Sequence, residues 1–173
     1  MIVVDEVERK YIITDFEKSE RWEKEQIVYQ WYTCIEDTFH KKLKLIFDLC
    51  ENRLIYVEVC KKNTGIGSAS KTVNYLDISS FQCNRMIGVP FVLKRRSIKR
   101  ELFVDRFVRS SGICKYLLED EGNDLEIRSH SEFRIIKEVT DTSEYYNQNN
   151  SKFESLSLFE ISCLSTPISI ISH

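Results

Sequence analysis

Apolar and charged side chains alternate along much of the chain. Leu43 and Leu45 alternate with Lys42 and Lys44, and the stretch 54–62 alternates in the same way after a short turn. Successive side chains of a β-strand point to opposite faces, so a period of two residues predicts strands with one apolar and one polar face. The two stretches therefore predict a hairpin.

Further stretches bring the number of predicted strands to eight; most of them alternate, 26–33 is rich in β-branched and aromatic residues, and 71–78 has a poor pattern. Pro90 lacks the N–H that an inner strand needs, so a strand is expected to begin after it. The predicted strands cover residues 3–11, 26–33, 40–49, 54–62, 71–78, 91–98, 101–108 and 113–121. The remaining predictions are a loop or short helix at 12–26, a loop at 63–70, a helical turn within 79–88, a loop with a short strand at 123–136, and a helix with an edge strand in the tail 152–173.

The first predicted strand carries a row of charge. Glu6, Glu8 and Lys10 fall two residues apart and share a face, whereas Val7 and Tyr11 lie on the other face. Burying three charges is costly unless they are paired or meet an ionic ligand. Two carboxylates suit a divalent cation, and the ammonium suits the phosphate that such a cation accompanies. The alternative is an amphipathic edge strand whose charged face lies in water.

Charged faces recur on the later strands and leave two architectures open. In a two-layer sandwich these faces would lie in solvent, whereas in a closed barrel with a covered exterior they would line a charged lumen. A lumen with both acids and bases favours a complex of a polyanion with Mg²⁺ or Mn²⁺ over a ligand of one charge. The recurring charged positions are Lys42, Lys44, Glu58, Lys62, Lys94, Arg96, Asp105, Glu119 and Glu121.

These charged motifs follow one another in an order that resembles the motif order of one protein family. The stretch Glu6-Val7-Glu8-Arg9-Lys10 resembles the ExExK signature of the CYTH family, also called triphosphate tunnel metalloenzymes. Further along, Gln30-Trp31-Tyr32 resembles its Gln-Gly-Tyr segment, Lys42-Leu43-Lys44 its Arg-x-Arg, and Lys94-Arg95-Arg96 its Lys-x-Arg. Lys62, preferred to Lys61 on strand parity, stands where the family has the lysine of a Leu-Thr-x-Lys strand.

The later part of the chain continues the resemblance and departs from it at one strand. Val104-Asp105-Arg106-Phe107 resembles the family's Val-Asp-x-Phe, and Glu119-Asp120-Glu121 its Glu-x-Glu. The stretch Lys137-Glu138-Val139-Thr140, followed by Tyr145-Tyr146-Asn147, resembles its Glu-Val-Thr and Tyr-x-Asn ending. At the fourth strand of the family's barrel, Val73 and Tyr75 stand where two carboxylates are usual.

The resemblance implies a fold, an activity and a site. The implied fold is a β-rich α+β domain over residues 1–150, a closed antiparallel eight-stranded β-barrel (tunnel) with a charged lumen and peripheral helices, with the tail 151–173 packing on or extending it. The implied activity is divalent-metal-dependent hydrolysis of inorganic tripolyphosphate or a nucleoside triphosphate, which makes the protein an enzyme. The implied phosphate-binding residues are Lys10, Lys42, Lys44, Lys62, Lys94 and Arg96, and the implied ligands of Mg²⁺ or Mn²⁺ are Glu6, Glu8, Asp105, Glu119 and Glu121. The implied catalytic set is Glu6, Glu8, Lys10, Glu119 and Glu121.

Two other functions stay open. The replacement of two carboxylates by Val73 and Tyr75 fits a pocket that binds a polyphosphate or nucleotide without hydrolysing it. Some members of the family resemble adenylate cyclases, which make cyclic AMP from ATP. No serine stands in a Gly-x-Ser-x-Gly motif and no Cys/His pair can be singled out, so nucleophilic catalysis has no support. The three histidines form no ligand pattern.

Charge and composition bear on the partners and the cellular compartment of the protein. The net charge of −2 gives no bulk attraction to nucleic acid or an anionic membrane, and no apolar run reaches the ~20 residues that span a bilayer. Six cysteines are scattered without a Cys-x-x-Cys pair, which predicts reduced thiols in a cytoplasmic protein. The predicted partner is a small molecule containing a triphosphate, with no membrane and no strong nucleic-acid signal, and a homodimer is left open.

Overall fold

The computed structural model describes residues 2–14, 16, 22–65, 68–81, 89–109, 112, 114–122, 132–140 and 142, and of Glu6 and Arg109 it describes the backbone alone. All the regular secondary structure within these residues is β-strand. The strands are β1 (Ile2–Val7), β2 (Arg9–Ile13), β3 (Lys24–Ile35), β4 (Phe39–Asp48), β5 (Arg53–Gly65), β6 (Ser68–Leu76), β7 (Phe91–Lys99), β8 (Leu102–Arg109), β9 (Tyr116–Asp120) and β10 (Ile135–Glu138). This part of the chain contains no helix long and apolar enough to cross a membrane.

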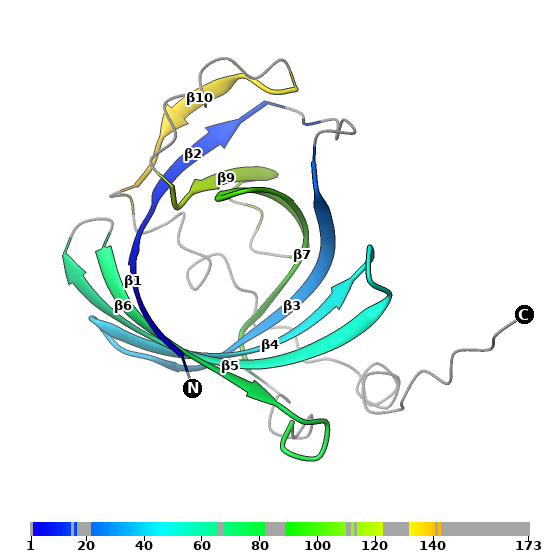
Figure 1. Cartoon of the computed structure of the whole chain (residues 1–173). Coiled ribbons are helices and arrows are strands. Elements are labelled where there is room, and N and C mark those ends of the chain that lie inside the picture. The colour runs from blue at the N-terminus through cyan, green and yellow to red at the C-terminus, as the bar shows by residue number, and fades with distance from the viewer. Residues whose placement is uncertain are drawn as a thin grey trace, which may run out of the picture.

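The ten strands form one antiparallel sheet in the order β1-β6-β5-β4-β3-β7-β8-β9-β2-β10 (Figure 1). The predicted closed barrel of eight strands with peripheral helices is therefore wrong, because the sheet has ten strands in an open order and the described residues form no helix. A barrel closes when its first and last strands pair. Here β1 at one edge pairs with β6 and β10 at the other edge pairs with β2, and no pairing joins the two edges among the described residues.

Although the sheet is open, it curves around an interior (Figure 1). The cause lies at Glu8, the single residue between β1 and β2, because β1 pairs with β6 whereas β2 pairs with β9. One continuous stretch of chain thus contacts two strands that lie far apart in the strand order. The concave face consequently collects side chains from distant parts of the sheet.

The face of the sheet that points away from this interior carries the main apolar core. Side chains directly opposite each other in an antiparallel pair share a face, and Trp31 pairs with both Leu43 and Phe91. All three are buried, and Phe81 packs edge-on against Trp31 with 6.2 Å between ring centroids. A second cluster on β2, β8 and β9 contains Tyr11, Ile13, Leu102, Val104, Tyr116 and Leu118, covered by Trp22 and Phe133. Burying a large apolar side chain contributes about 1.5–3 kcal/mol, so these clusters stabilise the sheet without occupying the interior.

The predicted strand positions agree with the structure better than the predicted architecture does. A strand lies at each of the eight predicted positions, and the first of them is divided at Glu8. The predicted loop 63–70 is shorter than expected, because β5 runs to Gly65 and β6 begins at Ser68. The predicted features at 125–127 and 151–173, most of 79–88, and the motif residues Tyr145 to Asn147 lie outside the described residues.

The strand β10 was missed by sequence reasoning, which placed a loop there. It has four residues, three of them exposed, and its register against β2 shifts between Ile135 and Lys137. A strand this short with a shifted register shows no period of two residues, so the pattern of apolar positions gives no sign of it.

Candidate functional site

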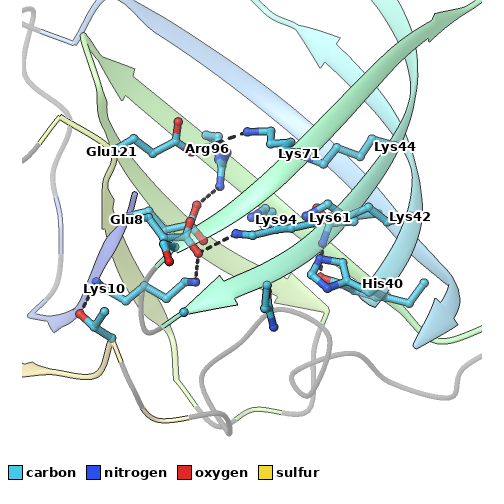
Figure 2. Close-up of a pocket in the computed structure, with 17 residues that line it drawn as sticks. Glu8, Lys10, His40, Lys42, Lys44, Lys61, Lys71, Lys94, Arg96 and Glu121 are labelled. Carbon is cyan, nitrogen blue, oxygen red and sulfur yellow. Dashed lines mark hydrogen bonds and ion pairs between the residues drawn. The ribbon is translucent and has the colours of Figure 1, made fainter. Parts of the chain in front are cut away.

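A pocket lies on the concave face of the sheet and is lined mostly by polar side chains (Figure 2). Its lining comes from strands on both sides of the Glu8 junction. The lining residues are Glu8, Lys10, Gln30, Tyr32, His40, Lys42, Lys44, Lys61, Asn63, Gly65, Ser68, Lys71, Lys94, Arg96, Glu119, Glu121 and Thr140. Seven of them are Lys or Arg and three are Glu, so the described lining has an excess of positive charge.

Strand alternation explains how so many charged side chains reach one pocket. Lys42 and Lys44 lie two residues apart on β4, and Leu43 between them turns to the apolar cluster on the outer face. Lys94 and Arg96 have the same spacing on β7. Because β4 and β7 both pair with β3 and keep this alternation in register, these two charged rows point into the interior.

Glu8, at the break between β1 and β2, connects two sides of the pocket. Its Oε1 accepts a hydrogen bond from Lys10 Nζ and another from Lys61 Nζ at 3.0 Å (Figure 2). The backbone fixes Lys10, because its N–H donates to Thr140 Oγ1 at 3.1 Å and its C=O accepts from Val139 N at 2.8 Å. A single carboxylate thus joins β5 to β2 across the interior.

Asp105 lies behind the pocket wall and binds two of the cations that line it. The fully buried carboxylate accepts hydrogen bonds from Lys94 Nζ and from Arg96, whose Nε and Nη2 lie 2.6 and 2.7 Å from its oxygens. Arg96 Nη2 also donates to Glu119 Oε2 at 2.5 Å. Burial alone would lower the pKa of Arg96, but the charges of Asp105 and Glu119 outweigh it and raise that pKa well above its usual value. Arg96 therefore stays a cation across the ordinary pH range.

The carboxylates that line the pocket lie against cationic side chains. Burial would raise the pKa of Glu119, but the charges of Arg96 and Lys94, with smaller contributions from Lys10 and Lys42, hold it well below its usual value. Glu121 follows β9 directly, and one of its carboxylate oxygens lies 4.0 Å from Lys71 Nζ.

Gln30 and Tyr32 of β3 add neutral hydrogen-bonding groups to the lining. Both are buried, and Gln30 Nε2 donates to the Tyr32 hydroxyl. Burial, followed by the nearby charge of Glu119, raises the pKa of Tyr32 well above its usual value, so Tyr32 stays a neutral phenol. Gln30 Oε1 is a buried acceptor with no hydrogen-bond partner among the described residues.

The structure brings most of the predicted site residues together. Eight of them line the pocket, namely Glu8, Lys10, Lys42, Lys44, Lys94, Arg96, Glu119 and Glu121. Asp105, predicted as a metal ligand, lies outside the lining, and its carboxylate holds Lys94 and Arg96 instead. Of Glu6 the backbone alone is described, and it pairs with Ala69 of β6.

Lys62, predicted to bind phosphate, lies outside the pocket. Its side chain is exposed, whereas Lys61 lines the pocket and binds Glu8. Lys62 was preferred because it shares a strand face with Glu58. That face is the outer one, where Glu58 forms an ion pair with Lys41 at 2.7 Å. The residues of β5 that face the interior are apolar at Val59 and charged only at Lys61. A row of charged residues therefore did not identify the inner face of β5.

Several lining residues were given no role by sequence reasoning. His40 lies two residues before Lys42 on β4, so a simple extension of that row would have included it. Lys71 lies directly opposite Lys61 in the β5–β6 pair, so it follows once Lys61 is placed inside. Gln30 and Tyr32 are neutral, and a search for charged rows passes over them.

The predicted metal ligands whose side chains the structure describes, all but Glu6, are not gathered into a group that could hold a metal ion. No group of three His, Cys, Asp or Glu side chains that could hold a metal ion occurs among the described residues. The carboxylates of the pocket bind cationic side chains instead, Glu8 through Lys10 and Lys61, and Glu119 through Arg96. Mg²⁺ and Mn²⁺ need several oxygen ligands converging on one point, and the described oxygens do not fit that requirement.

Comparison with known proteins does not place the chain in a family. No family model matches it, and no curated protein does so either. Among solved structures it is similar to the PH1819 protein from Pyrococcus horikoshii OT3, with a TM-score of 0.47 and 13% identity, over 71% of this chain and 81% of that chain. At that distance the similarity assigns neither a family nor a function, and the CYTH resemblance stays a prediction.

Proposed function

We propose that the pocket binds a linear oligophosphate, either inorganic tripolyphosphate or the triphosphate of a nucleotide. The observation that carries the proposal is the lining itself, in which seven cationic side chains face three carboxylates among the described residues. A site with such an excess of positive charge is stabilised by an anion of several charges.

The distribution of the cations favours an extended anion over a single phosphate. They come from β2 (Lys10), β4 (Lys42 and Lys44), β5 (Lys61), β6 (Lys71) and β7 (Lys94 and Arg96). A compact anion contacts a few donors at one point, whereas a chain of phosphates presents oxygens along its length. Ammonium and guanidinium groups on several strands therefore suit an oligophosphate.

Two neighbouring lysines of β5 provide a matched test of binding. Lys61→Met removes a cation from the pocket, and Lys62→Met removes one from the exposed outer face. We expect Lys61→Met to weaken the affinity for tripolyphosphate on the order of tenfold, and Lys62→Met to leave it near wild type. Titration calorimetry measures both, and a rise in the melting temperature of the wild type with ligand supplies an independent reading.

Two results would contradict the proposal. The first is the absence of any binding to folded wild-type protein at millimolar tripolyphosphate. The second is equal weakening by the two substitutions, which would trace the attraction to overall charge instead of to the pocket.

Hydrolysis of the bound triphosphate is a second candidate function, favoured by the presence of Glu8, Glu119 and Glu121 among the cations. A carboxylate near a phosphate chain can orient an attacking water. Phosphate release from tripolyphosphate and from ATP, measured with and without Mg²⁺ or Mn²⁺, tests this candidate. Release supports a triphosphatase, formation of cyclic AMP supports a cyclase, and binding without either product supports a non-catalytic binder.

We further propose a cytoplasmic location. The four cysteines within the described residues, Cys34, Cys50, Cys60 and Cys114, are free thiols, which suits a reducing compartment. Cell fractionation with an antibody against the protein tests this placement, and recovery in a secreted or membrane fraction would refute it.

A further inference from the structure

Lys44 differs from the other cations of the pocket in its surroundings. It is partly buried on β4, directly opposite Gln30 of β3 and Val57 of β5, neither of which carries a charge. Among the described residues, no carboxylate forms an ion pair or hydrogen bond with its ammonium group. Lys94 and Arg96, by contrast, share the buried carboxylate of Asp105.

The charged groups with the largest electrostatic effect on Lys44 have the same sign as its own. Burial is the main cause that lowers its pKa well below the usual value for lysine, followed by the charges of Lys42, Arg96, Lys94 and Lys71. Lys42 projects from the same strand two residues away, Lys71 from β6, and Lys94 and Arg96 from β7.

The other titratable groups around the pocket do not offset this repulsion. Glu8 accepts from Lys10 and Lys61, and Glu119 accepts from Arg96. Glu121 lies beside Lys71. Tyr32 on β3 stays a neutral phenol, and His40 lies further along β4.

An incoming anion would reverse these electrostatics. A buried lysine can lose its proton, whereas an arginine at the same place would stay charged. Phosphate oxygens next to the amine stabilise its protonated form and counter the surrounding cations. We propose that Lys44 takes up a proton from solvent when an oligophosphate enters the pocket, so that one amine becomes one ammonium as the complex forms. This inference rests on the proposed function and adds the uptake of one proton to the binding reaction.

The pH dependence follows from the sign of the change. Below the pKa that Lys44 has in the empty pocket the amine is already protonated, and binding takes up no proton. Above that pKa, and below its pKa in the complex, each binding event consumes up to one proton, so the affinity falls by up to about tenfold per pH unit as pH rises.

Titration calorimetry of the folded protein with tripolyphosphate tests the proposal. Runs at alkaline pH in buffers of different ionisation enthalpy give the number of protons taken up, and comparison of the wild type with Lys44→Arg separates the proton of Lys44 from any proton that the phosphate chain itself exchanges. We expect uptake for the wild type and none for Lys44→Arg, which still binds because its charge is permanent. Lys62→Arg, at an exposed position of β5, is the control and should retain the uptake.

The outcomes separate the two proposals. Binding without proton uptake by the wild type, or undiminished uptake by Lys44→Arg, overturns the role of Lys44 and leaves oligophosphate binding intact. No binding to the wild type overturns the proposed function and the proton uptake with it. If Lys44→Arg does not fold, Lys44→Gln replaces it and is expected to show no uptake, and persisting uptake in that variant equally refutes the inference.

Discussion

Two walls of the same pocket use the same kind of side chain in opposite ways. One, which we call the ion-pair wall, consists of Lys94, Arg96, Asp105 and Glu119. The other, the lysine wall, consists of Lys42 and Lys44 on β4 and Lys71 on β6. The exposed fraction of Lys94 is 1% and that of Asp105 is 0%, so that pair is removed from water.

The difference separates buried charges that are paired within the fold from Lys44, which forms no ion pair with a described carboxylate. Each buried charge of the ion-pair wall has a partner, and breaking such a pair leaves the other charge buried and uncompensated. On the lysine wall, burial lowers the pKa of Lys44, and the charges of nearby cations lower it further. Repulsion in the empty pocket lowers stability, and residues that depart from local rules in this way are typical of binding sites.

The largest expected effect comes from breaking the ion-pair wall. Asp105→Asn removes the negative charge that Lys94 and Arg96 share, while keeping the shape of the side chain. We expect the free energy of unfolding to fall by about 3–5 kcal/mol, the usual cost of leaving a buried charge without its partner. Urea denaturation measures it, and Asp37→Asn, at an exposed position, is the control. A loss below about 1 kcal/mol would mean that Asp105 does not hold this wall together.

A smaller effect is expected at the edge of the same wall, where Glu119 meets the pocket. Glu119→Gln weakens the bond from Arg96 and should cost about 2 kcal/mol at neutral pH, in the range of hydrogen bonds to charged groups. The pKa of Glu119 is lowered in the folded state, so its contribution is present above the unfolded value of about 4.3 and is lost as pH falls through the folded value.

The measurement for Glu119 is urea denaturation of both proteins as pH falls from neutral. The difference between wild type and Glu119→Gln should shrink with increasing acidity, whereas exposed Glu36→Gln should show no such trend. A difference that is constant with pH would show that the charge of Glu119 contributes nothing to folding.

The strands were predictable from the sequence because alternation is local. The rows that contain Lys42, Lys44, Lys94 and Arg96 are regular, and all four side chains lie where their parity places them. The architecture was not predictable in the same way. Whether the sheet closes depends on how β1 and β2 separate at Glu8 and on the short strand β10, and neither leaves a period of two residues in the sequence.

The site shows the same limit at the level of single side chains. Parity tells which residues share a face, but on β5 it does not tell which face is inside, and the charge of Glu58 pointed to the wrong one. Parity placed Asp105 towards the interior, yet its depth behind Lys94 and Arg96 depends on packing across strands. Those distances are set by tertiary structure, so no single-strand pattern encodes them.

The smallest expected effect concerns the lysine wall in the protein without ligand. Because the pKa of Lys44 is lowered in the folded state, that state binds fewer protons than the unfolded chain between the folded pKa and about pH 10.4. The free energy of unfolding of the wild type should therefore rise with pH in this window, by on the order of 1 kcal/mol. Lys44→Arg should remove the rise, since arginine keeps its charge in both states.

The experiment is urea denaturation of wild type and Lys44→Arg at a series of alkaline pH values, with the exposed Lys62→Arg as the control that keeps the rise. The series should stop below about pH 9.5, because the raised pKa of Tyr32 makes the folded state hold a proton that the unfolded chain loses near pH 10. That effect lowers stability with increasing pH and would mask the signal. Parallel curves for wild type and Lys44→Arg would mean that Lys44 is fully protonated in the empty pocket, and the two walls would then not differ in how they hold charge.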